Sequence, residues 1–346
     1  MIIRRSLQIL FVVLAGLVVT GMTAWGAGVL YYLGPGGPRV RTILALAFAA
    51  ATVVAFLALP GRLRTLFAFV VVFAALVGWW LSVAPSNDRD WLPDVAKAPW
   101  STRTGDLVTI HNIRNFQYRT ETDFVPRWET RTYDLAKLDS VDLVAVYWGS
   151  RAIAHTMLSF GFGGDYIAMS IEGRKERGEG YSTTGGFFKQ YELVYIAGDE
   201  RDLIGVRTTY RNPQEDVYVY RVNGPPENAR RVFLDYLRSM NEMRERPVFY
   251  NTLTTNCTTT VFLHARMNPE RPPFSWKLLA SGYVPQLLYE LGRIDTTIPF
   301  AELERASRVN DKAHAAGDDP AFSRRIREGL AIPPPLPERR ASSTTN

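Results

Sequence analysis

Cysteine is nearly absent from this sequence, since Cys257 is the only one among 346 residues. A single cysteine cannot form an intrachain disulfide, so cysteine usage does not indicate the redox compartment. It also excludes a cysteine-rich zinc site, and the chain contains neither HExxH nor CxxC spacing. The sequence therefore predicts no metal and no cofactor.

Clustered positive charge is also missing. The formal net charge is +6, but the lysines and arginines form no stripe of the kind that binds nucleic acid. A mild basic balance fits a protein that works beside anionic lipid headgroups equally well. We therefore predict a membrane, and no nucleic acid, among the partners.

Charge is almost absent from residues 1–84, whereas the rest of the chain is charged like a soluble protein. Residues 7–33 carry no charge and exceed the ~20 residues that a membrane-spanning helix needs. Residues 42–59 and 65–83 are shorter apolar runs, still above the lower limit of about 17 residues. Tryptophan and tyrosine lie near the ends of the runs, as membrane interfaces favour. Residues 1–84 are therefore predicted to form three transmembrane helices.

Arginines outside these runs predict the orientation. They form one pair before the first run and one pair in each connecting loop: Arg4 and Arg5, Arg39 and Arg41, and Arg62 and Arg64. Two pairs against one favour a cytoplasmic N-terminus by the positive-inside rule. Three spans then place everything after Val83 on the periplasmic side of a bacterial inner membrane. Two spans and one buried helix would instead place it in the cytoplasm.

Composition divides the remaining chain into three parts. Residues 85–103 are rich in proline and aspartate and are predicted to be a linker. Residues 104–300 alternate strand-like and helix-like patterns, which predicts one α+β domain with an antiparallel sheet. Residues 301–346 are charged and then rich in proline, which predicts a partly disordered tail.

Cys257 lies at the predicted start of a helix. Asn256 precedes it, and asparagine is a strong helix N-cap because its side-chain oxygen accepts a first-turn N–H. A thiol there faces the positive end of the helix dipole, which favours the thiolate. The backbone N–H groups of the first turn, with Asn256, are candidates for an oxyanion hole. The competing interpretation is that Cys257 is a small buried apolar residue.

His155 is the histidine with the best-placed partner. If Gly163-Gly164 is the two-residue turn of a β-hairpin, His155 lies directly opposite Glu172 on one face. A carboxylate beside an imidazole fixes its tautomer, so these two side chains and the thiol form a catalytic triad in outline. Ser170 and Asp165 remain alternatives for the third member, because a one-residue shift in register would turn Glu172 away.

A short basic run follows Glu172 and includes Arg174 and Lys175. Such a run is ordinarily a solvated loop. The alternative is a phosphate contact beside the site, since arginine can bind phosphate through two parallel hydrogen bonds.

Several segments, in order, resemble the domain of Lnb-type lipoprotein N-acyltransferases. They are HNIRNFQYR, YDLAKLDSVDLVAVYWG, AHTMLSFGF, SIEGRKERGEGYS and YNTLTTNCTTTV, and the resemblance runs from about Thr104 to Met267. That family resembles circularly permuted papain-like NlpC peptidases, and also the lecithin:retinol acyltransferase group, whose thiol takes an acyl chain from a phospholipid. The resemblance implies a permuted papain-like domain with a Cys-bearing helix. It also implies Cys257 as nucleophile, His155 as base and Glu172 as orienting residue.

Three functions follow as hypotheses. The first is a membrane-anchored thiol acyltransferase that moves an acyl chain from phospholipid through a Cys257 thioester to an amine, with the N-terminal cysteine of a lipoprotein as expected acceptor. The second is a cysteine peptidase or amidase acting on cell-wall peptide, and the third is a non-catalytic membrane scaffold. In described Lnb proteins the domain precedes its membrane helices, whereas here three predicted helices precede the domain.

Overall fold

The structure is a computed structural model that describes residues 2–332. These residues form two compact units. The first contains the chain up to Ser86 together with Tyr181–Tyr191, and the second contains Asn87–Gly180 and the chain from Glu192 onward. The first unit is therefore built from two separate segments of the sequence.

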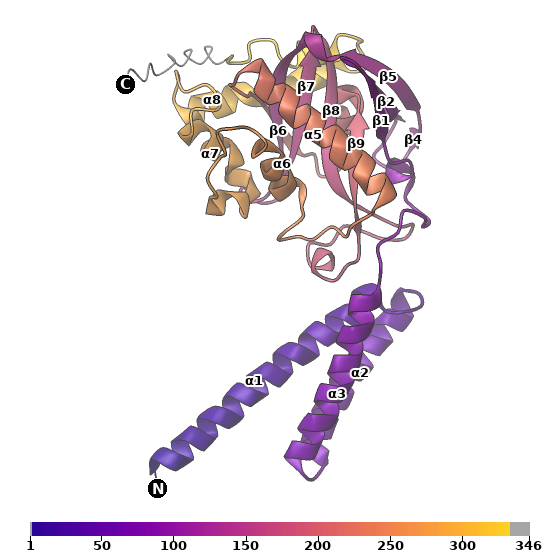
Figure 1. The fold of residues 1–346 in the computed structure, drawn as a ribbon, viewed down its shortest axis with the longest axis vertical. Coiled ribbons are helices and arrows are strands. Elements are labelled where there is room, and N and C mark those ends of the chain that lie inside the picture. Colours follow the sequence, from indigo (N-terminus) through magenta and orange to yellow (C-terminus); the bar gives the residue numbers. More distant parts are fainter. Residues whose placement is uncertain (1, 333–346) are drawn as a thin grey trace, which may run out of the picture. The chain divides into compact units, whose positions relative to one another are not determined.

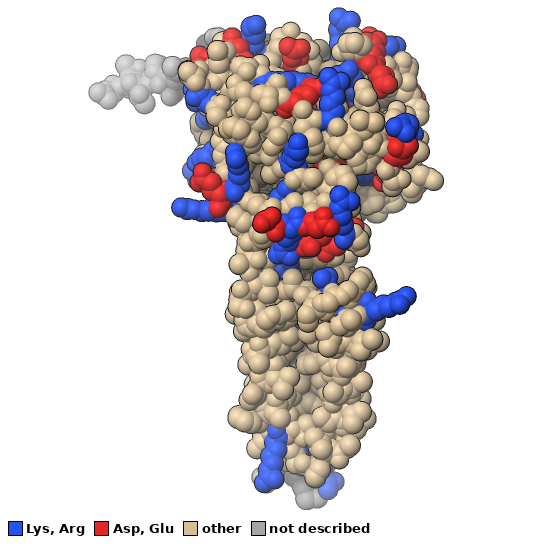
Figure 2. All heavy atoms as spheres, turned by 90° about the vertical axis from the view of Figure 1, so that its right-hand side faces the viewer, with Lys and Arg blue, Asp and Glu red and all other residues tan. Residues whose placement is uncertain are grey.

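Three long helices make up most of the first unit: α1 (Ile2–Leu33), α2 (Pro38–Ala58) and α3 (Arg62–Ser82). Each is long and apolar enough to cross a membrane. Large apolar side chains cover their outside, with Leu57 82% and Phe67 72% exposed, and Figure 2 shows almost no charged side chain along their length. Such a surface is stable in hydrocarbon and not in water. The described residues contain three helices of this kind, at the positions predicted for the membrane spans.

The segment Tyr181–Tyr191 packs on the ends of these helices. The ring of Phe188 stacks on Tyr32 with centroids 5.3 Å apart, and Gly28 lets it approach α1, since a Cβ there would lie 2.5 Å from the ring. Nζ of Lys189 donates to the carbonyl of Trp80 at 2.9 Å and lies 4.4 Å from its ring centroid. Aromatic and cationic groups of this kind favour the membrane–water interface.

An eight-stranded sheet forms the centre of the second unit. Its strands are β1 (Trp100–Thr104), β2 (Leu107–Arg114), β5 (Trp128–Asp134), β6 (Leu138–Tyr147), β7 (Ala154–Phe162), β8 (Asp165–Arg174), β9 (Glu192–Gly198) and β10 (Asp216–Arg221). The order is β1-β2-β9-β8-β7-β6-β10, with β5 paired to β2. Neighbours are antiparallel except β2 and β9. A separate ribbon pairs β3 (Gln117–Tyr118) with β4 (Phe124–Val125). The predicted α+β class with an antiparallel sheet agrees with this arrangement.

The β7–β8 hairpin has the predicted turn and register. Gly163 and Gly164 both have positive φ, 62° and 103°, which a two-residue type I′ turn requires and which glycine adopts without strain. Phe162 pairs with Asp165 and Leu158 with Met169. Continued along the strands, this register sets position 155 opposite position 172.

Helices cover both faces of the sheet (Figure 1). On one face lie α5 (Pro226–Glu245) and α6 (Cys257–Ala265), which contact β6 to β9. On the other lie α4 (Glu200–Leu203), the π-helical turn η4 (Val206–Tyr210), α9 (Asn310–Ala316) and α10 (Phe322–Arg325). The remaining helices are α7 (Val284–Glu290) and α8 (Phe300–Ser307), with 3-10 turns η1 (Pro93–Val95), η2 (Leu135–Lys137), η3 (Gly185–Phe187), η5 (Trp276–Leu278) and η6 (Ser281–Tyr283). Side chains alternate between the two faces of β7. Phe160 faces α5, where its ring packs on Phe233 with centroids 4.9 Å apart, and Met157 lies in the core on the opposite face of the sheet.

Two predicted domain boundaries differ from those in the structure. Residues 85–103 are not a linker, because Trp91 and Val95 are buried in the core and β1 begins at Trp100. The predicted tail from residue 301 is wrong up to the last described residues, since Val309, Phe322 and Ile326 belong to the same core. Composition misled in both places because a few apolar residues, widely spaced among charged ones, are enough to dock a segment. The tail from residue 333 onward lies outside the described residues.

Candidate active site

Cys257 is the first residue of α6 and its side chain is half-buried. Asn256 caps the helix: its side-chain oxygen accepts from the N–H of Thr259 at 2.9 Å, and Oγ1 of Thr259 accepts from the N–H of Asn256 at 3.0 Å. This reciprocal capping box holds the first turn in place. The local sequence therefore determines where the thiol stands.

The side-chain amide of Asn256 makes one further hydrogen bond besides the cap. Its Nδ2 donates one hydrogen to the carbonyl of Thr252 at 2.6 Å, and the role of the second amide hydrogen as an oxyanion donor stays a prediction. The N–H groups of Cys257 and Thr258 have no acceptor among the described residues, as is normal in a first helical turn. The backbone of these two residues is therefore a candidate oxyanion hole, with the second amide hydrogen of Asn256 as a predicted additional donor.

His155 belongs to a hydrogen-bonded chain of three side chains. Its Nε2 lies 2.7 Å from Oγ of Ser170, and Ser170 donates its hydrogen to Oε1 of Glu172 at 2.8 Å. A hydroxyl has one hydrogen, so the serine oxygen must accept from the imidazole. Nε2 therefore carries the ring proton, and Nδ1, which has no hydrogen-bond partner in the part of the chain described, is the basic nitrogen.

Glu172 belongs to this hydrogen-bonded series of side chains only through Ser170. The distance from Nε2 of His155 to Oε1 of Glu172 is 3.7 Å, too long for a hydrogen bond. Positions 170 and 172 share one face of β8, so the predicted residue and one of its alternatives are both present. Asp165, the other alternative, is exposed at the hairpin turn and lies outside the site.

Arg207 is the site residue that sequence reasoning missed. It comes from η4, its side chain is 4% exposed, and it donates to Oε1 of Glu172 at 3.0 Å. Burial alone raises the pKa of Glu172, but Arg207, with His155 and Arg114, outweighs it, and the pKa of that carboxyl falls well below its ordinary value. Glu172 is therefore a carboxylate at every physiological pH. No local pattern around Arg207 signals this contact.

The imidazole of His155 is kept neutral. Burial lowers the pKa of His155 to about 3, with Arg207 adding to the shift and Glu172 opposing it. A neutral imidazole is the form that accepts a proton. Because the unfolded chain takes up this proton near pH 6.5 and the folded chain does not, stability falls as the pH falls from about 6.5 toward 3.

The helix of Cys257 contacts the strand of His155 through the residues that follow each of them. Oγ1 of Thr258 and Oγ1 of Thr156 are 3.1 Å apart and buried. Neighbouring residues of a strand point to opposite faces, so His155 faces Ser170 while Thr156 faces α6. Sγ of Cys257 lies 3.7 Å from Oγ1 of Thr258, and no hydrogen bond joins it to His155 within residues 2–332. The structure thus assembles the histidine, serine and glutamate, and places the thiol beside their strand without joining it to the ring.

Arg174 has a structural role, so its prediction as a phosphate contact is corrected. Its side chain is buried, with 3% exposure of the residue. It donates to the carbonyls of Val95 and Ala96 at 2.9 Å and to Oδ1 of Asn87 at 3.2 Å, and it lies 4.3 Å from the ring centroid of Trp91. Arg174 therefore holds residues 87–96 against β8. Lys175 is half-buried and its carbonyl accepts from the N–H of Leu92 at 2.9 Å; a substrate contact for its side chain stays a prediction.

Replacing Arg174 with methionine is expected to lower the free energy of unfolding by about 2–4 kcal/mol, because the buried carbonyl of Val95, two partly buried acceptors and the Trp91 ring lose their partner. Lys175→Met is the matched control and should change it by less than about 1 kcal/mol. Tryptophan fluorescence of the detergent-solubilised chain during denaturation measures both. An unchanged unfolding midpoint for Arg174→Met would contradict the structural role.

Other histidines of the second unit have partners elsewhere. His264 lies between Asp235, 2.7 Å from Nδ1, and the hydroxyl of Tyr195, 2.8 Å from Nε2. His111 stacks on Trp100. Within residues 2–332 no group of three or more His, Cys, Asp or Glu side chains could hold a metal ion.

These features define a membrane protein whose α+β domain carries a histidine–serine–glutamate chain beside a thiol-bearing helix. Residues 124–282, just under half of the chain, match the family model of the Lnb N-terminal periplasmic domain. The chain therefore contains an Lnb-type domain, as its motifs predicted, and it is a membrane protein with a periplasmic domain. The match to that domain suggests an enzyme, and the matched range includes His155 and Cys257. No curated protein and no solved structure matches the chain.

Proposed function

We propose that the protein is a membrane-anchored thiol acyltransferase with a permuted papain-like domain. It moves an acyl chain from a phospholipid, through a thioester on Cys257, to an amine, for which the N-terminal cysteine of a lipoprotein is the proposed acceptor. The observation that carries the proposal is the ordered chain from His155 through Ser170 to Glu172, which leaves Nδ1 free as a base on a strand in contact with the helix of Cys257.

The first half-reaction uses these groups in turn. Nδ1 of His155 accepts the thiol proton while sulfur attacks the ester carbonyl of the phospholipid. The N–H groups of Cys257 and Thr258 bind the resulting oxyanion. The ester C–O bond then breaks, and the lysophospholipid oxygen leaves with the proton from His155. Glu172 stabilises the transient imidazolium through Ser170. In the free protein His155 and the helix of Cys257 lie on opposite faces of β7, so the proposed reaction requires the first turn of α6 and the imidazole to rearrange until the thiol and Nδ1 meet.

The second half-reaction returns the thiol. An amine attacks the thioester carbonyl and gives its proton to His155, the C–S bond breaks, and sulfur takes the proton back. The products are an amide and the free cysteine. A free amine attacks a thioester more readily than water does, and the three helices agree with an acceptor that is itself held in the membrane.

A cysteine peptidase or amidase is the second candidate, because the same groups could open an amide of cell-wall peptide. Three membrane helices favour the lipid reaction, since a wall hydrolase needs a single tether.

Mass spectrometry of the full-length protein in lipid discs separates these two functions. With phospholipid and a diacylated lipopeptide, an acyltransferase gains the mass of one acyl chain on Cys257 and transfers it to the peptide amine. With muropeptides, a peptidase releases fragments and no acyl adduct appears. Cleavage of muropeptide without any acyl-enzyme would overturn the proposal.

Replacing Ser170 with alanine is expected to slow thioester formation by about 10- to 100-fold, because the hydroxyl that orients the imidazole and fixes its tautomer is lost. Nitrogen NMR of histidine-labelled protein should show the Nε2–H form in the wild type and a mixture of tautomers in the variant. Ser170→Thr keeps a hydroxyl and should recover most of the rate. Equal rates for the wild type and Ser170→Ala would remove serine from the mechanism.

A further inference from the structure

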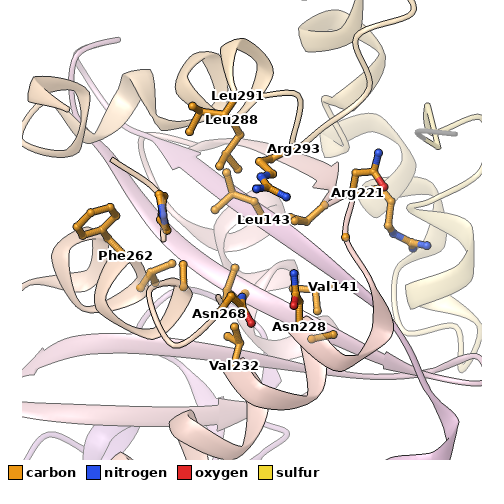
Figure 3. Close-up of a pocket in the computed structure, with 18 of the residues that line it drawn as sticks. Val141, Leu143, Arg221, Asn228, Val232, Phe262, Asn268, Leu288, Leu291 and Arg293 are labelled. Carbon is orange, nitrogen blue, oxygen red and sulfur yellow. The ribbon is translucent and has the colours of Figure 1, made fainter. Parts of the chain in front are cut away.

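A cavity of about 210 Å³ lies between the sheet and the helices α5, α6 and α7 (Figure 3) and reaches Thr258, the residue after Cys257. Its wall is mostly apolar and includes Leu143, Leu158, Val232, Val261, Phe262 and Leu287. Apolar concave sites of this kind bind hydrocarbon more strongly than polar groups, which would lose their hydration without replacement.

Thr258 joins this cavity to Cys257. It lines the cavity, and its Oγ1 is 3.7 Å from the thiol sulfur. Thr156 of β7, which lies within hydrogen-bond distance of Thr258, lines the same end. From there the wall follows one face of α6 through Val261 to Ala265, a distance of about 10 Å at 1.5 Å per residue. A group bonded to the sulfur can therefore enter the cavity at one end and extend along the helix.

Polar side chains of the cavity already have partners. Arg221 and Arg293 both line it (Figure 3), but Arg221 is paired with Asp142 and Arg293 with Glu270. Their charge is balanced by carboxylates, so the cavity offers a poor site for a phosphate. A lipid headgroup is accordingly a weaker candidate for the occupant than a lipid chain.

We propose that this cavity receives the acyl chain carried on Cys257 and selects it by length; the inference rests on the proposed function. The acyl carbonyl stays at the first turn of α6, and the methylenes extend from Thr258 toward Ala265. Each enclosed methylene improves the preference by roughly fourfold. The preference increases with chain length until the cavity is full and then stops increasing.

Chain-length-dependent labelling of the thiol tests the cavity without requiring catalysis. Alkyl methanethiosulfonates form a disulfide between their alkylthio group and Cys257 and release methanesulfinate. In the full-length protein, hexadecyl and methyl reagents are compared. Ala265→Phe fills the cavity from a half-buried position on α6 and should lower the hexadecyl-to-methyl ratio of rates by at least about tenfold, the effect of a few excluded methylenes.

Leu263→Phe is the matched control, because Leu263 is on the same helix with 53% exposure and does not line the cavity. It should leave the ratio unchanged. Phe262→Ala enlarges the cavity and should raise the ratio, which gives a second result in the opposite direction. Methyl labelling at the wild-type rate shows that each variant is folded around the thiol.

The outcomes separate the two proposals. Equal ratios in the wild type, Ala265→Phe and Phe262→Ala overturn the acyl cavity, whatever the enzyme does with phospholipid. The expected shifts in ratio support it. If they occur while phospholipids with hexadecanoyl or octanoyl chains give no thioester, the cavity stands and the acyltransferase proposal fails. With an active enzyme, Ala265→Phe should use octanoyl lipid and lose hexadecanoyl lipid.

Discussion

Replacing Cys257 with alanine is expected to reduce acyl transfer from phospholipid by at least about a thousandfold, since removal of a catalytic nucleophile leaves only the contribution of binding and oxyanion stabilisation. The chain has no other cysteine that could substitute. Intact-protein mass spectrometry should show the acyl adduct in the wild type and none in the variant, and the lipopeptide should stay diacylated.

The Cys257→Ala protein should remain folded. The side chain is half-buried, and the start of α6 is held by the capping box of Asn256 and Thr259 rather than by the thiol. A melting temperature within a few degrees of the wild type would confirm this. His155→Gln is the complementary variant, with the thiol still present and open to methyl methanethiosulfonate but slow in acyl transfer. Normal acylation by Cys257→Ala would show that sulfur is not the nucleophile.

Replacing Arg327 with methionine is expected to destabilise the second unit by about 3–5 kcal/mol, because removing one partner of a buried ion pair leaves uncompensated charge. Its side chain is 8% exposed and bridges two fully buried carboxylates, at 2.8 Å from Asp142 and 2.7 Å from Glu200. It also lies over the ring of Tyr166, 3.6 Å from the centroid. Asp142 still has Arg221 as a partner, so most of the expected loss of stability comes from the buried charge of Glu200.

Arg325→Met provides the control for this variant. Arg325 is two residues away and pairs with Asp319 at the surface, with both side chains 37% exposed. Exposed pairs contribute about 0–1 kcal/mol, so thermal unfolding in detergent should be nearly unchanged. If both variants melt like the wild type, residues beyond 301 do not stabilise the domain. Loss of stability in Arg327→Met alone supports the C-terminal helices as part of the fold.

Features that depend on neighbouring residues could be predicted from the sequence. The three membrane helices follow from uninterrupted apolar runs, a property of each segment alone. The β7–β8 register follows from Gly163-Gly164, because two residues with positive φ allow a tight turn that sets every later pair. That register was enough to place His155 opposite Glu172. The capping box likewise set the start of α6 at Cys257.

Features that depend on contacts between distant segments could not be predicted from the sequence. Arg174 looked like part of an exposed basic run, and only the docking of residues 87–96 showed that it is buried. Arg207 reaches Glu172 because η4 packs under the sheet, a contact between elements that share no local pattern. The cavity beside Thr258 is formed by α5, α6, α7 and the strands β6, β7 and β10 together.

The sequence by itself determined the membrane helices, the hairpin that bears the histidine, and the capped helix that bears the thiol, because short-range backbone and hydrophobic preferences decide each of them. Only the tertiary structure decided that Ser170 lies between His155 and Glu172, that Arg207 holds the carboxylate ionised, and that an apolar cavity reaches Thr258 beside Cys257. These contacts depend on how separate elements pack in three dimensions, where burial and the low dielectric of the interior act across long sequence distances.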